Sequence, residues 1–244
     1  MYVLAVALSV LIGVALGLLG GGGSILTTPI LLYAMHLPAK EAIATSLVVV
    51  GTTSAAAVIS HARAGNVEWK TGLLFGGAGM AGAFGGGLIA GYIPDQVLLL
   101  LFAAMMLATS VAMFRGRKEG GPTQAQAVWK IVLDGLVVGV VTGLVGAGGG
   151  FLVVPALTLL GGLPMRKAVG TSLLVITLKS FAGYAGHAAH VHIDFELAAT
   201  VSAAAVVGSV FGGLLAQRIP PETLRKGFAG FVLVMAIFVI SQQV

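Results

Sequence analysis

Cysteine is absent from this sequence, and charged residues are scarce. The absence of cysteine excludes disulfide bonds and thiol catalysis. Only 9% of the residues are charged and 58% are hydrophobic, whereas a soluble domain carries about 25% charged residues. So few charges cannot cover the water-facing surface of a chain of 244 residues. The composition therefore excludes a soluble globular protein and indicates an integral membrane protein.

Long apolar runs provide the membrane spans that such a protein needs. The runs 3–19, 43–59, 97–114 and 228–240 contain no charged residue. A helix needs about 20 such residues to cross a bilayer. A lipid-facing β-barrel would instead show short segments of alternating polarity, and these runs are continuous. The sequence therefore predicts an all-α polytopic membrane protein.

The chain contains an internal duplication. Shifted by 126 residues, the distance from Gly17 to Gly143, the sequence matches itself without a gap. The matched positions include Gly20–Gly23 with Gly146–Gly149, Pro29 with Pro155, Thr45-Ser46-Leu47 with Thr171-Ser172-Leu173, and His61 with His187. Duplications of this kind are typical of transporter folds. We predict a first membrane repeat at 1–115, a linker at 116–129 and a second membrane repeat at 130–244.

Each half is predicted to be a broken helical hairpin followed by three transmembrane helices. In each hairpin a helix (2–19 or 131–145) reaches a glycine cluster, and a short apolar segment (24–36 or 150–162) follows. A proline interrupts each segment and kinks it, because proline lacks a backbone donor. At 1.5 Å per residue such a segment is too short for a core of about 30 Å, so we expect it to be re-entrant. The three longer helices are expected at 39–62, 67–92 and 96–115, and at 165–188, 194–217 and 221–241.

The basic residues indicate that the two halves have inverted topology. A hairpin plus three spans begins and ends on opposite sides of the membrane, which inverts the second half. Every lysine and arginine except Lys40 and Lys179 then lies on one face. Basic loops favour the cytoplasm. We therefore expect a multi-pass protein of the cell membrane with both termini outside and the linker 115–130 in the cytoplasm.

The duplicated motif resembles the TauE/SafE sulfite exporter family. The residues that carry the resemblance are Gly20–Ser24, Pro29 and Thr45-Ser46, repeated as Gly146–Gly150, Pro155 and Thr171-Ser172. The resemblance covers essentially the whole chain and implies a permease for sulfite, sulfonates or related organosulfur anions. The expected function is secondary transport of a small anion by alternating access. An anion channel and a transporter of a non-sulfur organic anion are the alternatives.

The candidate substrate site is built around the glycine clusters. A half-helix that starts after such a cluster presents unpaired N–H groups and the positive end of its dipole, and two of them can meet around one anion. Alternatively, the glycines are close-packing surfaces or hinges. Nearby hydroxyls either donate to an oxyanion or bond back to their own helix. The candidate residues are Gly20, Gly21, Gly22, Gly23, Ser24, Thr45, Ser46, Thr53, Gly146, Gly148, Gly149, Gly150, Thr171, Ser172 and Lys179.

Lys179 is a charge within an apolar run, which costs several kcal/mol unless it is paired or solvated. It either snorkels to a membrane face or pairs with a carbonyl, or it attracts the anion and replaces a coupling cation. His61 and His187 are expected at interfacial helix ends, as structural residues or as a proton relay. Asp134 is the one carboxylate placed to act as a coupling acid.

Several other functions are disfavoured by the sequence. No Lys-Ser/Thr pair follows either glycine cluster, which argues against a phosphate-binding loop. Catalytic residue types do not cluster at membrane depth, so we expect no enzyme. His190, His192 and Asp194 are interpreted as a solvated loop, and we expect neither a metal nor a cofactor. The net charge of +5 lies in short loops and does not predict nucleic-acid binding. The expected partners are the lipid bilayer and a small anionic substrate, with a coupling proton or cation and a homodimer left open.

Overall fold

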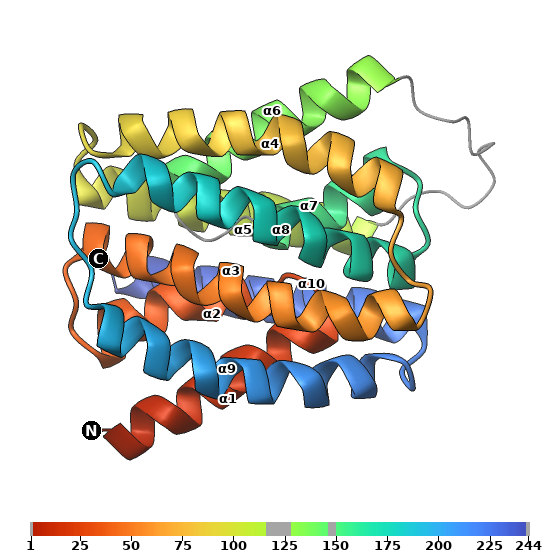
Figure 1. Ribbon diagram of the computed structural model, residues 1–244, viewed down its shortest axis with the longest axis horizontal. Helices are drawn as coiled ribbons and strands as arrows, with labels where there is room; N and C mark the ends of the chain where they lie inside the picture. Colours follow the sequence, from red (N-terminus) through yellow and green to blue (C-terminus); the bar gives the residue numbers. More distant parts are fainter. Residues whose placement is uncertain (1, 116–127, 146–149, 243–244) are drawn as a thin grey trace.

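The computed structural model describes residues 2–115, 128–145 and 150–242, and all regular elements in these ranges are helical (Figure 1). The long helices lie side by side along one common direction. The elements are α1 (Tyr2–Leu19), α2 (Gly22–Pro29), η1 (Ile30–Ala34), α3 (Ala39–Arg63), α4 (Trp69–Ala90), α5 (Asp95–Arg115), α6 (Val128–Val145), α7 (Gly150–Pro155), η2 (Ala156–Leu160), α8 (Met165–His187), α9 (Phe195–Ala216) and α10 (Pro221–Ser241). Seven of these helices are long and apolar enough to cross a membrane. The predicted all-α polytopic fold is confirmed.

Helix boundaries follow from local chemistry that recurs in both halves. Pro38 and Pro164 are the N-caps of α3 and α8. Proline has no backbone N–H, and a residue at the start of a helix needs none, because its N–H has no partner within the helix. After α3 the chain turns at Gly65, whose φ of +71° is cheap only for glycine. Asp194 caps α9 by accepting hydrogen bonds from the backbone N–H groups of Glu196 and Leu197.

The short segments after the glycines are broken helices, and each proline sets the break. Directly after Pro29 and Pro155, the chain changes from α-helix to the π-helical segments η1 and η2. Proline cannot donate to the α-helical ladder, and the hydrogen bonds shift to five-residue spacing. Met35 N donates to Ile30 O at 3.1 Å and Gly161 N to Ala156 O at 2.8 Å. The predicted kinks are therefore found as π-turns.

The first helix of each half packs on the other half. On α1, Gly13 and Gly17 lie against the backbones of Ala205 and Ser209 on α9. The same contact occurs at the equivalent positions between α6 and α4, where Gly139 and Gly143 lie against Gly79 and Ala83. These glycines bring backbones together so closely that a Cβ at Gly13 would lie 1.9 Å from the Ala205 oxygen. Small residues at such crossings are typical of membrane helices.

Equivalent helices of the two halves run in opposite directions where they meet. On α3 and α8, Leu47 lies by Gly183 and Gly51 lies by Ser180, so residue numbers rise on one helix as they fall on the other. On α5 and α10, Ser110 Oγ donates to Ala229 O at 2.9 Å and Arg225 Nη1 to Met113 O at 3.5 Å. The described chain starts and finishes at the same end of the molecule (Figure 1).

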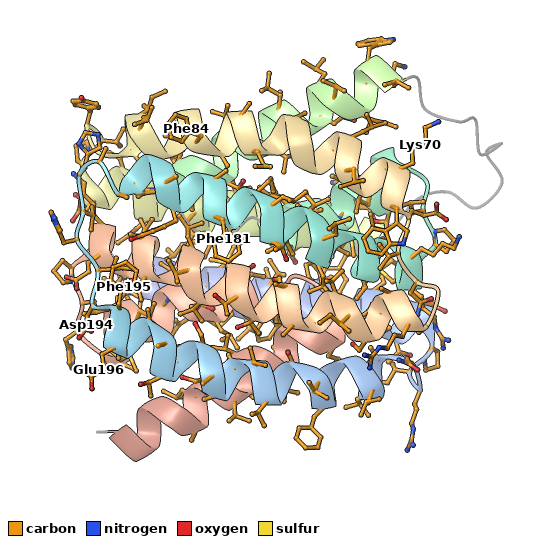
Figure 2. The ribbon with its side chains drawn as sticks, viewed as in Figure 1. Lys70, Phe84, Phe181, Asp194, Phe195 and Glu196 are labelled. Atoms are coloured by element: carbon orange, nitrogen blue, oxygen red, sulfur yellow. The ribbon has the colours of Figure 1, made fainter. Side chains whose placement is uncertain are left out.

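The two ends of the bundle differ in charge, and its sides are apolar. Figure 2 shows Lys70 at one end and Asp194 and Glu196 at the other. Between the ends, Phe84 and Phe181 are 43% and 45% exposed on the outer surface. Large apolar side chains exposed along the middle of a bundle suit a hydrocarbon surrounding, with polar ends in water. The end that carries Lys70 is called the basic end below.

Candidate functional site

The starts of the two broken segments meet inside the bundle. A Cβ built on Gly150, the first residue of α7, would lie 2.7 Å from the Cα of Gly21 and 3.0 Å from Ser24 Oγ. Gly21 is the N-cap of α2, and as a glycine it has no side chain that could cap the helix with a hydrogen bond. Gly20, Gly21, Gly23, Ser24 and Gly150 are all buried. Sequence positions far apart are thus brought into backbone contact, which only residues without a Cβ permit.

Hydroxyl groups from the long helices bind the same region. Ser172 Oγ on α8 shares its hydrogen between its own helix at Val169 O (2.7 Å) and Gly20 O (2.9 Å). Gly20 has a φ of +68°. Ser46 on α3, the repeat equivalent of Ser172, accepts a 3.1 Å hydrogen bond from Thr28 Oγ1. Both long helices thus bind the first broken segment, Ser46 through Thr28 of α2 and Ser172 through Gly20 in the turn before α2.

Three other candidate hydroxyls are placed differently. Thr171 Oγ1 accepts a 2.9 Å hydrogen bond from the backbone N of Glu68 and ties the start of α8 to the loop before α4. Thr53 Oγ1 bonds back to Val49 O at 2.7 Å. Thr45 is 1% exposed and its Oγ1 has no partner. Gly22 begins α2, and Gly146, Gly148 and Gly149 lie outside the described residues.

Lys179 lies buried between α4, α6 and α8. Its side chain is 1% exposed, and it therefore does not reach either end of the bundle. Its stem packs on Gly79, where an added Cβ would lie 2.6 Å from Lys179 Cδ. Its Nζ donates to Thr142 Oγ1 at 3.2 Å. Among the described residues no carboxylate pairs with it. An ammonium held by one hydroxyl at this depth is a candidate for interaction with an anion.

The two repeat-related histidines are buried, which differs from the expected interfacial position. His61 and His187 are 2% and 1% exposed. Each uses Nε2 to bind a glycine carbonyl on the helix that leads to a glycine cluster, Gly17 O at 3.2 Å and Gly143 O at 2.9 Å. A carbonyl only accepts, so Nε2 carries the hydrogen in both rings. The reason for the burial is the close packing of glycine-rich α1 and α6, which brings these carbonyls within reach.

A second pair of buried hydroxyls comes from the matched stretches Thr52-Thr53-Ser54 and Leu178-Lys179-Ser180 and is not among the candidate site residues. Ser54 on α3 and Ser180 on α8 are repeat equivalents and are fully buried, and their Oγ atoms have no partner among the residues that the structure describes. Ser180 lies beside Gly51, where the two helices cross. Buried polar atoms without partners are uncommon and indicate a functional position. The repeat register pairs the two serines in the sequence itself, because Ser54 falls on Ser180 at the common offset.

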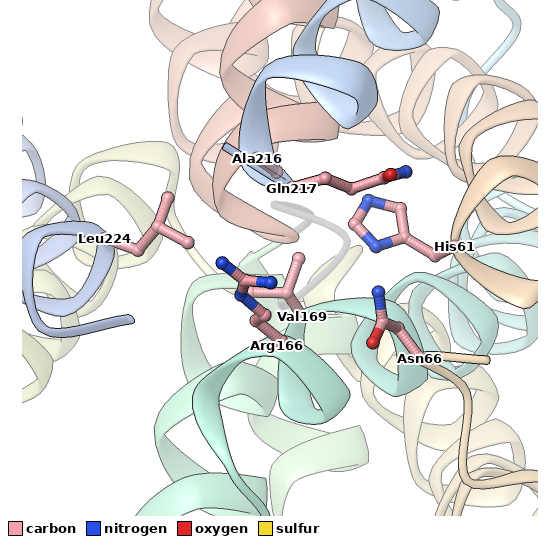
Figure 3. Close-up of a pocket in the computed structure, with 7 residues that line it drawn as sticks. All are labelled: His61, Asn66, Arg166, Val169, Ala216, Gln217 and Leu224. Atoms are coloured by element: carbon pink, nitrogen blue, oxygen red, sulfur yellow. The ribbon is translucent and has the colours of Figure 1, made fainter. Parts of the chain in front are cut away.

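A pocket opens at the basic end of the bundle (Figure 3). It encloses about 220 Å³, counting the part open to solvent. Its lining comes from the ends of α3, α8, α9 and α10 and from the loop after α3. The lining residues are His61, Asn66, Arg166, Val169, Ala216, Gln217 and Leu224.

The repeat-equivalent region at the opposite end is packed shut. Lys40, the counterpart of Arg166, donates to Gly91 O at 3.0 Å and lies 3.8 Å from a carboxylate oxygen of Asp95. Ile43, Ala90 and Leu98, the counterparts of Val169, Ala216 and Leu224, form one buried cluster. Two related halves therefore present one open and one closed end.

The apolar helices, the broken segments and the duplication together define a class of protein. Apolar helices form a multi-pass membrane protein, and two broken segments place glycine backbone and hydroxyls at its centre. Broken helices that meet in a duplicated bundle are the architecture of membrane transporters.

Comparisons with known proteins identify the family. The model of the sulfite exporter TauE/SafE family matches residues 5–239. A probable membrane transporter protein of Xylella fastidiosa is 37% identical over 94% of this chain and 91% of its own length. The probable membrane transporter protein YdhB of Bacillus subtilis is 27% identical over 88% of this chain and 91% of its own. No solved structure matches. The chain belongs to the TauE/SafE sulfite exporter family, a family of membrane transporters.

Proposed function

We propose that this protein is a secondary transporter of a small anion, sulfite or an organosulfonate. The observation that carries the proposal is the contact between the starts of α2 and α7, at Gly21 and Gly150. The buried hydroxyls of Ser24 and Ser172 lie in the same region. Uncapped backbone N–H groups at the start of a helix attract anions, and hydroxyls can rotate to donate to one. The buried ammonium of Lys179 adds positive charge at membrane depth.

The difference between the two ends supports alternating access as the mechanism. One end holds the pocket and the other is closed by Lys40 with Gly91. Because the halves share one sequence pattern, each end can in principle adopt the other's packing. Exchange of the two arrangements would expose the centre first to one side and then to the other.

The orientation in the membrane completes the proposal. Antiparallel equivalents, such as α3 and α8, are what inverted repeats require, and the basic end would face the cytoplasm. The termini would then lie outside the cell membrane and the 115–130 linker inside. The two repeats would be 1–115 and 130–244, with a proton or cation as coupling ion.

The test is uptake of labelled sulfite into proteoliposomes that contain the purified protein. Unlabelled sulfate, thiosulfate, a sulfonate and a carboxylate serve as competitors. We expect saturable flux that sulfur oxyanions inhibit and the carboxylate does not. Folded protein without flux above empty liposomes, or flux that a carboxylate blocks equally, would contradict the substrate assignment. Unsaturable flux at channel rates would contradict the carrier mechanism.

A matched pair of variants separates the site from the scaffold. Ser172→Ala removes the hydroxyl that binds Gly20 O, whereas Thr171→Ala removes one that binds the amide of Glu68 outside the centre. Both changes delete one buried hydroxyl on the same helix. Flux per folded protein should fall several-fold more for Ser172→Ala, because a hydrogen bond contributes about 1 kcal/mol and more when it binds a charge. Equal losses would argue against this position for the site.

A further inference from the structure

The pocket at the basic end combines one cation, two amides and a buried imidazole. Arg166 and Gln217 are exposed at its rim, Asn66 is partly buried, and His61 forms its floor with 2% exposure. Figure 3 shows the guanidinium of Arg166 and the ring of His61 on opposite sides of the pocket. Val169, Ala216 and Leu224 form the apolar remainder of the wall. This residue set adjoins the glycine site through Val169, which also contacts Gly20, but its polar side chains have no part in the proposed central binding.

The imidazole of His61 has one nitrogen occupied and one unused. Nε2 donates to Gly17 O at 3.2 Å. Nδ1 is buried and has no hydrogen-bond partner within the described part of the chain. In the neutral ring this nitrogen is an acceptor. A buried acceptor without a partner costs free energy, so a ligand that donates a hydrogen to it is stabilised.

Arg166 retains most of its hydrogen-bonding capacity. Its Nη2 donates to Ile219 O at 3.3 Å, and among the described residues no carboxylate pairs with it. A guanidinium has five N–H donors in a fork that matches two oxygens of an oxyanion. The neighbouring cations of the basic end, Arg63 and Arg218, would raise the local concentration of anions further.

The closed end shows how the same positions look when no ligand site is formed. There the cation is Lys40, which donates to Gly91 O and pairs with Asp95. Gln217 has a glycine, Gly91, as its counterpart and therefore has no equivalent amide. Asn66 and His61 correspond to His192 and His187, so among the polar lining positions only Gln217 has a counterpart without a polar side chain.

We propose that this pocket is a second anion site, which binds a small tetrahedral oxyanion that still carries a proton, such as hydrogenphosphate. Two oxygens accept from Arg166, the amides of Asn66 and Gln217 donate to a third, and the remaining O–H donates to His61 Nδ1. The acceptor nitrogen gives the site a preference that charge alone cannot give. A fully deprotonated oxyanion such as sulfate presents only acceptors and leaves Nδ1 without a partner.

The absence of native cysteine makes a clean binding assay possible. Ile219→Cys places a single thiol beside the Arg166 guanidinium, which binds the backbone carbonyl of residue 219, and its rate of maleimide labelling is measured in nanodiscs of neutral phosphatidylcholine. Inorganic phosphate is the probe, because sulfite itself consumes thiol reagents. Saturating phosphate should slow labelling about five-fold or more, as expected for a ligand that covers the thiol, and sulfate should protect less. Tyr92→Cys at the opposite end, 81% exposed, is the control whose labelling stays unchanged.

Arg166 variants then test the source of the protection. In the Ile219→Cys protein, Arg166→Gln should raise the half-protecting phosphate concentration about ten-fold, and Arg166→Lys should give an intermediate value. No protection by phosphate, or protection that survives Arg166→Gln, overturns the proposal. Equal protection by sulfate overturns the acceptor role of His61. Slow labelling in phosphatidylglycerol nanodiscs without added phosphate would show that the pocket binds a lipid headgroup, and it would overturn the proposal as well. Since no flux is measured, the result is independent of the transport assay.

Discussion

Replacing Gly20 by alanine perturbs the centre of the site, and Gly65 provides a matched control. Both residues have a positive φ, +68° and +71°, which costs a non-glycine residue about 1–2 kcal/mol. A Cβ at Gly65 meets nothing within 4 Å, whereas one at Gly20 lies 2.8 Å from Ser172 Oγ and 2.8 Å from the Cα of Val169. Overpacking of this kind costs about 1–3 kcal/mol more. Gly20→Ala should therefore destabilise the protein by about 2–5 kcal/mol and Gly65→Ala by about 1–2 kcal/mol.

Thermal unfolding of the purified proteins in detergent measures the difference. The melting temperature should fall in the order wild type, Gly65→Ala, Gly20→Ala. Flux per folded protein should be kept by Gly65→Ala and lost by Gly20→Ala, because the added methyl pushes Ser172 away from the carbonyl that it binds. Equal melting temperatures would refute the packing argument. A stable Gly20→Ala protein with normal flux would refute the position of the site.

Three further predictions concern the helix contacts, the buried cation and the topology. Gly82→Ala should give a lower melting temperature than Gly85→Ala. A Cβ at Gly82 would lie 2.3 Å from a backbone oxygen of α6, whereas one at Gly85 meets nothing within 4 Å. The reverse order of melting temperatures would contradict the close packing. Lys179→Met keeps the apolar stem that packs on Gly79 and removes the buried amine, so the melting temperature should rise. Flux should be strongly reduced, and full flux would exclude a transport role for Lys179. A membrane-impermeant thiol reagent applied to intact cells should label Tyr92→Cys and leave Lys70→Cys unlabelled, and the opposite pattern would reverse the proposed orientation.

Sequence reasoning predicted the helices well, because their signals are local. Prolines and glycines mark most boundaries, and the expected 165–188 and 221–241 agree with α8 and α10 to within a residue. The duplication register located equivalent residues in both halves without any structure. It also brought Ser172 into the candidate list, and Ser172 does contact the glycine region.

The remaining features depend on packing between distant segments, which no local signal encodes. Thr171 and Ser172 are neighbours in sequence, yet one faces the loop before α4 and the other faces Gly20, as helical geometry separates adjacent side chains. The burial of His61 depends on how closely α1 approaches it. The difference between the two ends has no counterpart in the repeat pattern, since a pattern shared by both halves predicts equal ends.

The exchange of first helices between the halves has a consequence for biosynthesis. Gly13 of α1 rests on Ala205 of α9, so α1 meets its partner only after most of the chain has been made and inserted. Until then its glycine face is exposed to lipid or to a temporary neighbour, and no hydrophobic driving force within the bilayer distinguishes the two. By contrast, α4 already stands in the membrane when α6 arrives. The order of synthesis therefore sets the order of assembly. When α6 is inserted, its partner α4 is already in the membrane, whereas α1 has no partner until α9 is inserted.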